Sequence, residues 1–405
     1  MSTTISVVMA TYNRRDVLLG TLQRLTDSLP GEHSCEIIVV DNGSADGTPA
    51  AVRSCFPDVQ TIRLARNFGS CAKAFGVDRA EGRFVVFLDD DSCPRRGSLS
   101  RMIQRFEQEP RLGAAGFLVH LPDGRRECSA LPDVFVGCGV GFRREALQEV
   151  GGLDRTLFMQ AEEYDLSFRL TAAGWAVRVF PDLHVDHLKT PQSRLSGRTV
   201  YYDALNNLLV AARYLPDGFE TPFRVDWSQR YRWLAGAAGQ RRAYWWARGA
   251  AALRCARDRR RFARWRLNTS SVRCLFGFDR VRQAFRELGA AHTVVFAGLG
   301  KIIYPFLEAA IERSVRVSSI GDDRFARPGR RYRGIPILPL GQALRERFDA
   351  IVISNTSPVH AEETEGRIAG IADAPILRPF GYDRPITAGR PEPQPAWPGT
   401  CVTPA

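Results

Sequence analysis

The chain has 405 residues, of which 44% are hydrophobic and 25% are charged. This composition is that of a soluble globular protein and excludes disordered and fibrous classes, and the length predicts two or three domains. The net charge of +12 indicates an anionic partner, but charge alone does not separate nucleic acid from a lipid surface or a phosphorylated substrate.

The N-terminal sequence MSTTISVVMATYNRR leads directly into an expected β-strand. It has no basic region followed by an apolar run and a small-residue cleavage site, so it does not predict export, and we expect a cytoplasmic protein. The nine cysteines form no C-x-x-C pair and show no regular spacing. This pattern favours reduced thiols over a disulfide framework or a structural zinc site.

Residues 5–180 alternate short, β-rich apolar runs with segments of helical period, which predicts an α/β domain with a largely parallel sheet. The expected strands are ISVVMA, EIIVVD, TIRLA and RFVVFLDDD, with helices from Asp16, after Thr48 and near Ser70. In open α/β sheets the ligand crevice lies outside the carboxyl ends of the strands. The polar strand ends at residues 11–13, 41–43 and 89–91 are therefore expected to converge on one site.

Three consecutive aspartates, Asp89, Asp90 and Asp91, follow the apolar run FVVFL. Like charges this close raise one another's pKa unless a cation is present. Oxygen ligands on a flexible loop suit Mg²⁺ or Mn²⁺, which bridge a protein carboxylate and substrate phosphates. A solvated acidic turn is the alternative interpretation.

The motifs resemble, in order, those of the family 2 glycosyltransferases of the GT-A fold across roughly residues 4–220. The matching segments are SVVMATYNR, IIVVDNGSADGT, NFGSCAKAFG, DDD, GCGVGFRREALQEVGGLD, AEEYDLSFRL and HVDHLKTP. The third departs from the family's N-x-G-x-A-x-A-R-N-x-G pattern because the Arg-Asn pair is missing. The resemblance implies a metal-dependent, inverting transfer of a sugar from an NDP-sugar to a hydroxyl acceptor. A cell-surface glycan, a glycolipid and a small-molecule natural product are all candidate acceptors.

The resemblance also implies a role for individual residues. Asp41 is expected to recognise the base of the nucleotide, and Asp89 to lie near the ribose. Asp91 and Asp89 are expected to hold Mn²⁺ or Mg²⁺, with His187 as a further metal or diphosphate contact. The other expected substrate-binding residues are Thr11, Tyr12, Arg14, Arg66, Asn67, Lys73 and Asp90.

Some of these residues have an alternative interpretation. Arg66 and Lys73 are candidate cations for the phosphates, with Lys73 in place of the missing arginine, but a plain surface role is open for both. His184 is expected to be structural. The nearby cysteines are expected to be small packing residues, because nothing supplies a base to activate them. They are Cys71, Cys93 and Cys138.

Two carboxylates are candidates for the general base that takes the acceptor's proton. Glu162 and Glu163 lie four and three residues before Leu166, with Leu170 a turn beyond. In a helix, both would lie in the first turn, where the dipole favours the ionised form that a base needs. Glu163 occupies the position of the family's catalytic aspartate and is the expected base, with Glu162 beside it. Two carboxylates that cap a helix are the alternative.

Residues 221–285 are expected to be helical and basic, with the segments RYRWLAG, RRAYWWARG and CARDRRRFARWRL. Asp226 and Asp258 are the only acidic residues between Thr221 and Ser270. The segment suits a peripheral interface with anionic lipid at the inner face of the membrane. A solvated helix pair packed on the catalytic domain is the alternative. Nucleic-acid binding is unsupported because no recognised module accompanies the charge.

Residues 286–383 predict a smaller, Rossmann-like α/β domain with strands at TVVFAG, VRVSSIGDD and DAIVIS. Helices are expected from Lys301 and over LGQALRERF. The third glycine of G-x-G-x-x-G is replaced by Ile303, so the dinucleotide motif is weak. The arrangement more closely resembles a module that precedes sugar-modifying enzymes of surface-polysaccharide pathways. Nucleotide binding and a packing or dimerisation role both stay open.

The expected domains are a catalytic domain over 1–220, the basic helical segment over 221–285, the Rossmann-like domain over 286–383 and a disordered tail over 384–405. Two other functions are possible alternatives. One is a nucleotide-sugar oxidoreductase or epimerase in the C-terminal module, which lacks a Tyr-x-x-x-Lys pair. The other is a non-catalytic scaffold that binds sugar nucleotides without turnover.

Overall fold

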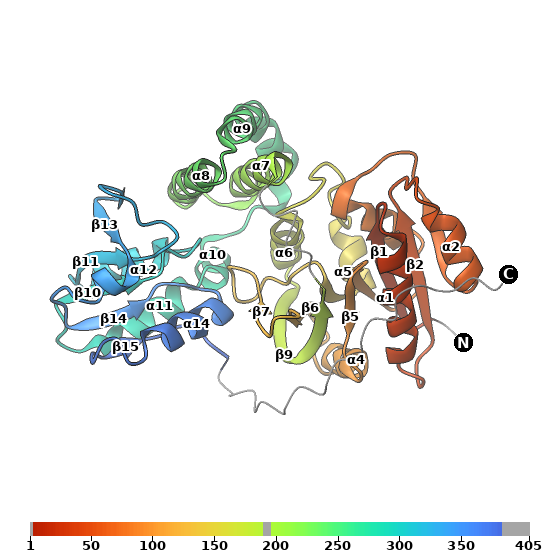
Figure 1. Ribbon diagram of the computed structural model, residues 1–405, viewed down its shortest axis with the longest axis horizontal. Helices are drawn as coiled ribbons and strands as arrows, with labels where there is room; N and C mark the ends of the chain where they lie inside the picture. Colours follow the sequence, from red (N-terminus) through yellow and green to blue (C-terminus); the bar gives the residue numbers. More distant parts are fainter. Residues whose placement is uncertain (1–2, 189–195, 383–405) are drawn as a thin grey trace. The chain divides into compact units, whose positions relative to one another are not determined.

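The structure is a computed structural model, and it describes residues 3–188 and 196–382. The expected tail over 384–405 lies outside these residues. The chain divides into two compact units, each with its own sheet (Figure 1). The first contains residues up to Glu127 and the segment from Phe135, and the second contains Cys128–Val134 and Leu195–Tyr382.

The first unit is built on a nine-stranded mixed sheet with the order β3-β2-β1-β4-β8-β6-β9-β5, and β7 pairs with β6. Its strands are β1 (Ile5–Thr11), β2 (Cys35–Asp41), β3 (Gln60–Arg63), β4 (Phe84–Asp89), β5 (Ser92–Pro94), β6 (Leu112–His120), β7 (Arg126–Glu127), β8 (Gly139–Arg143) and β9 (Ala176–His187). The four strands from β3 to β4 are parallel, as expected. The sheet is mixed because β8 runs antiparallel to both β4 and β6.

The sequence did not reveal β8, because its GVGFR segment carries two glycines and little β-branched character. The glycines have a packing role. A Cβ on Gly141 would lie 2.1 Å from the Sδ of Met102, and a Cβ on Gly139 would lie 2.5 Å from a methyl carbon of Val185. Close packing against helix and strand neighbours therefore determines these residues and hides the strand pattern.

Helices cover the sheet of the first unit. They are α1 (Arg15–Ser28), α2 (Thr48–Cys55), α3 (Lys73–Val77), α4 (Ser98–Gln108), α5 (Arg144–Val150) and α6 (Glu162–Ala172), with the short 3₁₀ helix η1 (Gly69–Ala72). In α4, the buried residues Leu99, Met102, Ile103 and Phe106 follow the helical period and form one apolar face. Strands β1 and β4 are buried on both faces, as a covered parallel sheet requires.

The second unit begins with helices and continues with a six-stranded sheet of order β12-β13-β11-β10-β14-β15. The helices before the sheet are α7 (Gly197–Tyr214), α8 (Glu220–Ala237), α9 (Arg241–Arg261), α10 (Thr269–Leu275) and α11 (Phe278–Phe285). The strands are β10 (Thr293–Ala297), β11 (Arg316–Gly321), β12 (Arg331–Tyr332), β13 (Ile335–Leu338), β14 (Ala350–Ile353) and β15 (Ile376–Leu377), with helices α12 (Tyr304–Glu312), α13 (Leu340–Ala343) and α14 (Pro358–Ile368). A helical segment followed by a second α/β sheet is thus confirmed.

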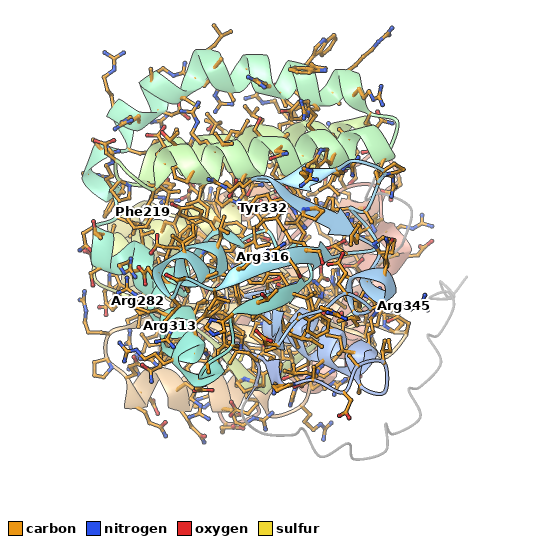
Figure 2. The ribbon with its side chains drawn as sticks, turned by 90° about the vertical axis from the view of Figure 1, so that its left-hand side faces the viewer. Phe219, Arg282, Arg313, Arg316, Tyr332 and Arg345 are labelled. Atoms are coloured by element: carbon orange, nitrogen blue, oxygen red, sulfur yellow. The ribbon has the colours of Figure 1, made fainter. Side chains whose placement is uncertain are left out.

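Two helices of this sheet differ from the expectation. The helix expected from Lys301 begins at Tyr304, because Pro305 lies in its first turn, where a missing N–H costs nothing. The helix expected over residues 340–348 ends at Ala343, and the chain continues as single turns. Figure 2 draws the side chains of this unit, with Phe219 just before α8 and Tyr332 on β12. Within the described ranges, no helix has both the length and the apolar character to cross a bilayer.

Candidate active site

The polar ends of the parallel strands meet in the first unit. Thr11, the last residue of β1, pairs in register with Asp41 of β2, and Ala10 pairs with Asp89 of β4. The hydroxyl of Thr11 donates a hydrogen bond of 2.8 Å to Oδ2 of Asp90. The expected convergence of the three strand ends is therefore present.

Arg14 neutralises two of the three consecutive aspartates. Its Nη1 lies 2.5 Å from Oδ1 of Asp90, and its Nη2 lies 2.7 Å from Oδ2 of Asp91. Burial raises the pKa of Asp90 to about 7, although Arg14 opposes the shift. Burial also acts on Asp91, but there His187 and Arg14 outweigh it and lower the pKa to about 2. Of these two carboxylates, Asp91 is therefore the one that stays ionised.

Lys73 is the partner of the third aspartate. Its ammonium lies 2.6 Å from Oδ1 of Asp89 and donates a hydrogen bond of 2.9 Å to the carbonyl of Gly137. The side chain is almost completely buried, at 3% exposure. Burial would lower the pKa of Lys73, but Asp89 outweighs it and raises the pKa. A surface role for Lys73 is thereby excluded.

His187 reaches the aspartates from the neighbouring strand. Ser92 of β5 pairs with His187 of β9, and the N–H of Leu188 donates to the carbonyl of Asp91. The Nε2 of His187 then lies 3.2 Å from Oδ1 of Asp91 and 4.0 Å from Oδ2 of Asp89. Burial would lower the pKa of His187, but Cys138 and the two carboxylates outweigh it and raise the pKa to about 11.

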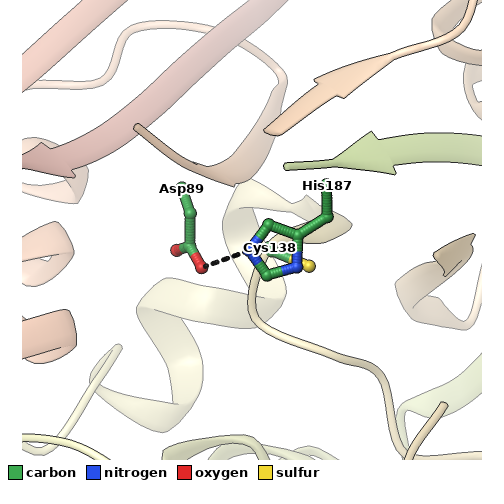
Figure 3. A group of neighbouring side chains, drawn as sticks. All are labelled: Asp89, Cys138 and His187. Carbon is green, nitrogen blue, oxygen red and sulfur yellow. Dashed lines mark ion pairs between the residues drawn. The ribbon is translucent and has the colours of Figure 1, made fainter. Parts of the chain in front are cut away.

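These residues fit a divalent cation. The donor atoms of Asp89, Cys138 and His187 lie within 4.8 Å of one another (Figure 3). Carboxylate oxygens with one imidazole suit Mn²⁺ or Mg²⁺, whereas thiolate ligands select softer metals. Burial raises the pKa of the Cys138 thiol, although His187 opposes the shift, and sulfur is a softer ligand than these cations prefer. Asp89, Asp91 and His187 are therefore the residues that would hold such a cation, and His187 would lose its proton on binding.

The two candidate bases follow a turn with an uncommon backbone. Three residues without glycine's freedom, Phe158, Gln160 and Ala161, have φ values of 65°, 68° and 64°. Each such residue costs on the order of 1 kcal/mol, and such strain concentrates at functional sites. The helix α6 begins immediately afterwards at Glu162, as expected.

Contacts with residues 69–71 hold this turn. The carbonyl of Phe158 accepts hydrogen bonds from the hydroxyl of Ser70 at 3.2 Å and from the N–H of Cys71 at 3.3 Å. A Cβ on Gly69 would lie 2.1 Å from the same carbonyl oxygen, and Gly69 has a φ of 65°. Glycine at this position therefore permits the close approach of the two loops.

Glu162 and Glu163 have different surroundings. The hydroxyl of Ser70 donates to Oε1 of Glu162, while Oε2 is buried with no hydrogen-bond partner among the described residues. Burial, reinforced by Glu163, raises the pKa of Glu162 to about 8. Burial also raises the pKa of Glu163, while the N–H of Gly137 and the charge of Lys73 oppose the shift. Gly137 thus connects Glu163 to the Lys73–Asp89 pair.

The remaining expected residues lie in adjoining loops. The carboxylate of Asp41 is fully buried and accepts the N–H of Ser44 at 3.2 Å, while Oδ1 of Asn67 accepts the N–H of Gly69 at 2.7 Å. Tyr12 is 45% exposed, and the exposed Arg66 lies with its guanidinium 4.7 Å from the ring centre of Phe68. Neither Tyr12 nor Arg66 has a polar side-chain contact with the aspartates in the described structure.

Sequence reasoning missed the roles of Ser70 and Gly137, and it treated Cys138 as packing only. Gly137 and Cys138 lie in the recognised GCGVG segment, but the amino-acid sequence does not indicate that Gly137 contacts Glu163. A Cβ on Gly137 would lie 3.3 Å from Oε1 of Glu163. His184 was expected to be structural, and its Nδ1 lies 3.0 Å from Nε2 of His120. It is not among the residues that contact Asp89, Asp90 or Asp91 in the described structure.

Comparison with known proteins identifies the family of the chain. The family model "Glycosyl transferase family 2" matches residues 6–133, and "Glycosyl transferase family group 2" matches residues 126–307. The N-acetylglucosaminyl-diphospho-decaprenol L-rhamnosyltransferase of Mycobacterium tuberculosis is 28% identical over 239 residues, which cover 47% of this chain and 77% of the relative. The pre-mycofactocin glycosyltransferase of the same organism is 30% identical over 198 residues, covering 43% of this chain and 41% of the relative.

Among solved structures, the mannosyltransferase PcManGT from Pyrobaculum calidifontis, in complex with GDP-Man and Mn²⁺, aligns with a TM-score of 0.43 and 20% identity. The alignment covers 67% of this chain and 82% of that one. The family expected from the motifs is confirmed by the two consecutive family matches. The chain is a glycosyltransferase family 2 enzyme with a GT-A-like domain, a helical segment and a second mixed sheet.

Proposed function

We propose that the chain transfers a sugar, with inversion, from a metal-bound NDP-sugar to a hydroxyl acceptor. The observation that carries this proposal is the juxtaposition, through Gly137, of the Asp89–Lys73 pair and the carboxylate of Glu163. One side of the arrangement can stabilise a leaving diphosphate. The other side can accept a proton from the attacking hydroxyl.

In this proposal the donor is held by the strand ends. Asp41 binds the base, Asp89 lies at the ribose, and Arg14 and Lys73 supply positive charge beside the diphosphate. A divalent cation on Asp89, Asp91 and His187 would, when bound, neutralise the charge that develops on the leaving group. Lys73 is already 2.6 Å from Asp89, so it fixes that carboxylate before the donor arrives.

Glu163 is the proposed base. The acceptor oxygen bonds to the anomeric carbon, the bond to the diphosphate breaks, and the hydroxyl proton passes to the carboxylate. Burial raises the pKa of Glu163, so the group holds the proton more firmly than an exposed glutamate does. Glu162 lies beside it and is the alternative base.

The acceptor is proposed to be a glycolipid or another surface glycan, with a small-molecule natural product as the alternative. The rhamnosyltransferase relative is named for a diphospho-decaprenol acceptor. In this chain, α9 exposes Trp245, Trp246 and Leu253 to 52%, 76% and 85% beside many arginines. Exposed aromatic and basic side chains suit contact with an anionic membrane surface. We propose that α9 provides such a contact at the inner face of the membrane.

Thermal-shift measurements with UDP, GDP and their sugar conjugates, with and without Mn²⁺, test the donor proposal. Stabilisation by a nucleoside diphosphate that requires Mn²⁺, followed by transfer from the matching NDP-sugar, is the expected result. A folded protein that shows neither would contradict it.

A further inference from the structure

The second unit contains a hollow of about 600 Å³ whose charged wall is entirely cationic. It lies between the end of α8, the start of α9 and the segment that follows β11. Its charged lining residues are Arg232, Arg241, Arg324, Arg327 and Arg330, which we call the arginine pocket. None of the described residues that line it has a carboxylate, so the positive charges face one another across the space.

These five arginines have no ion-pair partner among the described residues. Other arginines of the same unit do have such a partner, as Arg213 has in Asp258 and Arg333 has in Asp226. In the pocket, by contrast, Arg330 donates only to the carbonyl of Phe325, at 2.9 Å, and Arg327 donates only to the carbonyl of Ala326. The acids closest in sequence are already engaged elsewhere.

Those acids are Asp322 and Asp323, which directly follow β11. Asp322 accepts the N–H groups of Leu299, Arg324 and Phe325, and Asp323 pairs with Arg367. Neither acid therefore forms an ion pair with an arginine of the pocket. Burial lowers the pKa of Arg330, and the neighbouring Arg327 and Arg232 lower it further. A bound anion would relieve this repulsion.

Aromatic side chains hold the guanidinium groups in place. The guanidinium of Arg330 lies 4.9 Å from the ring centre of Trp233, and Tyr244 and Trp245 complete the wall. Planar guanidinium groups recognise phosphate oxygens with paired hydrogen bonds. Several such groups around one space match a group with more than one negative charge, and a diphosphate has that property.

The arginine pocket adjoins the position where open parallel sheets bind ligands. A second hollow, of about 730 Å³, lies at the carboxyl ends of β10, β11 and β14 and shares Leu234, Arg324 and Phe325 with the first. In many parallel sheets, backbone N–H groups of the glycine-rich turn after the first strand bind a phosphate. Here the N–H of Leu299 in the turn after β10 instead donates to Asp322 at 2.7 Å. Arginines can supply that function instead.

We propose that the arginine pocket binds the diphosphate group of a phosphorylated ligand, whose remaining part extends into the hollow at the strand ends. The interaction needs no metal, because guanidinium groups provide all the positive charge. The site lies wholly in the second unit and is separate from the Asp89–Asp91 site. It therefore does not depend on the proposed sugar transfer.

Calorimetric titration of the full chain with inorganic pyrophosphate in EDTA tests the proposal. The double variant Arg232→Ala, Arg327→Ala should bind about 10²-fold more weakly, as expected for the loss of two charge-assisted contacts. Its melting temperature without ligand should be unchanged or higher, since like charges near Arg330 are removed. Lost binding without lost stability separates ligand recognition from a structural role.

A matched control is the double variant Arg345→Ala, Arg347→Ala. Both are exposed arginines of the same unit that line neither hollow, and Arg345 is seen at the right in Figure 2. Pyrophosphate affinity should stay unchanged in this control. It should also stay unchanged in Asp91→Asn, which distinguishes the arginine pocket from the donor site.

Vesicles distinguish a soluble diphosphate from a lipid headgroup. If the wild type binds pyrophosphate in solution and the Arg232, Arg327 double variant does not, the ligand is a soluble diphosphate. If pyrophosphate does not bind but co-sedimentation with phosphatidylglycerol vesicles depends on the same two arginines, the phosphate belongs to a lipid. Absence of both effects, or equal binding by variant and wild type, refutes the site.

Discussion

Replacement of Glu163 by glutamine is the sharpest test of the proposed mechanism. The amide retains an oxygen that can accept the N–H of Gly137, so the contact between the two loops should survive. What is lost is the ability to take a proton. Positioned proton transfer supplies about 10² to 10⁴ in rate, so the rate of sugar transfer should fall by at least about 10²-fold. Donor affinity should stay near that of the wild type.

The pH dependence of kcat/KM provides a second measurement on the same residues. A base acts in its ionised form, so a raised pKa moves the loss of activity at low pH upward. Because burial raises the pKa of Glu163, kcat/KM should still rise with pH between pH 6 and pH 8. An exposed glutamate would give a flat profile over that range. The Glu163→Gln variant should lose this dependence of kcat/KM on pH.

The matched variants are Glu163→Asp and Glu162→Gln. The aspartate retracts the carboxylate by one methylene from Gly137, so we expect partial activity and no rescue. Glu162→Gln should have a milder effect, because its Oε1 is bonded to Ser70. If Glu162→Gln is inactive while Glu163→Gln still turns over, the assignment is wrong by one residue and Glu162 is the base.

Three further predictions concern the metal, the loop contact and the membrane. Asp91→Asn keeps the shape but loses the charge, so Mn²⁺-dependent binding of UDP or GDP should disappear in a thermal-shift assay, and unchanged affinity would contradict the metal assignment. Gly69→Ala places a Cβ 2.1 Å from the carbonyl oxygen of Phe158. The rate of sugar transfer should therefore fall, and a denaturant titration should show a loss of stability of about 1 kcal/mol or more. A fully active variant would show that the contact is dispensable. Replacing Trp246 and Leu253 with serine should reduce co-sedimentation with anionic vesicles, and wild-type binding should weaken as salt rises; equal binding to neutral vesicles would count against the contact.

The sequence predicted the strand ends because their signal is local. Apolar runs that stop at Thr11, Asp41 and Asp89 mark parallel strands, and parallel strands bring their carboxyl ends together. The start of α6 at Glu162 was equally accessible, because apolar residues at helical spacing follow it. These features depend on a few neighbouring residues, which single-sequence patterns can show.

Features that depend on pairs distant in sequence could not be predicted in the same way. The contact between Lys73 and Gly137 joins residues 64 positions apart, and the contact between Ser70 and Glu162 joins residues 92 apart. Gly69 has no side chain, so the sequence around it gives no indication of its close contact with the carbonyl of Phe158. Strand β8 was missed for a related reason, since packing against Met102 selects glycine where a strand signal would need larger residues.

The two units handle charge in opposite ways, and this determines what each can bind. In the first unit, three aspartates face three cations, Arg14, Lys73 and a protonated His187. A divalent cation that replaced the proton on His187 would add one positive charge to the site, which the diphosphate of a donor would then help to neutralise. Metal and donor binding should accordingly favour each other there.

In the second unit, the excess positive charge is already present without a metal. The two acids between Thr221 and Ser270 form internal pairs, Asp258 with Arg213 and Asp226 with Arg333 and Tyr332. Both acids are therefore already paired with arginines outside the arginine pocket. The negative charge that balances this pocket must come with the ligand, and that requirement is met by a diphosphate and not by a neutral sugar.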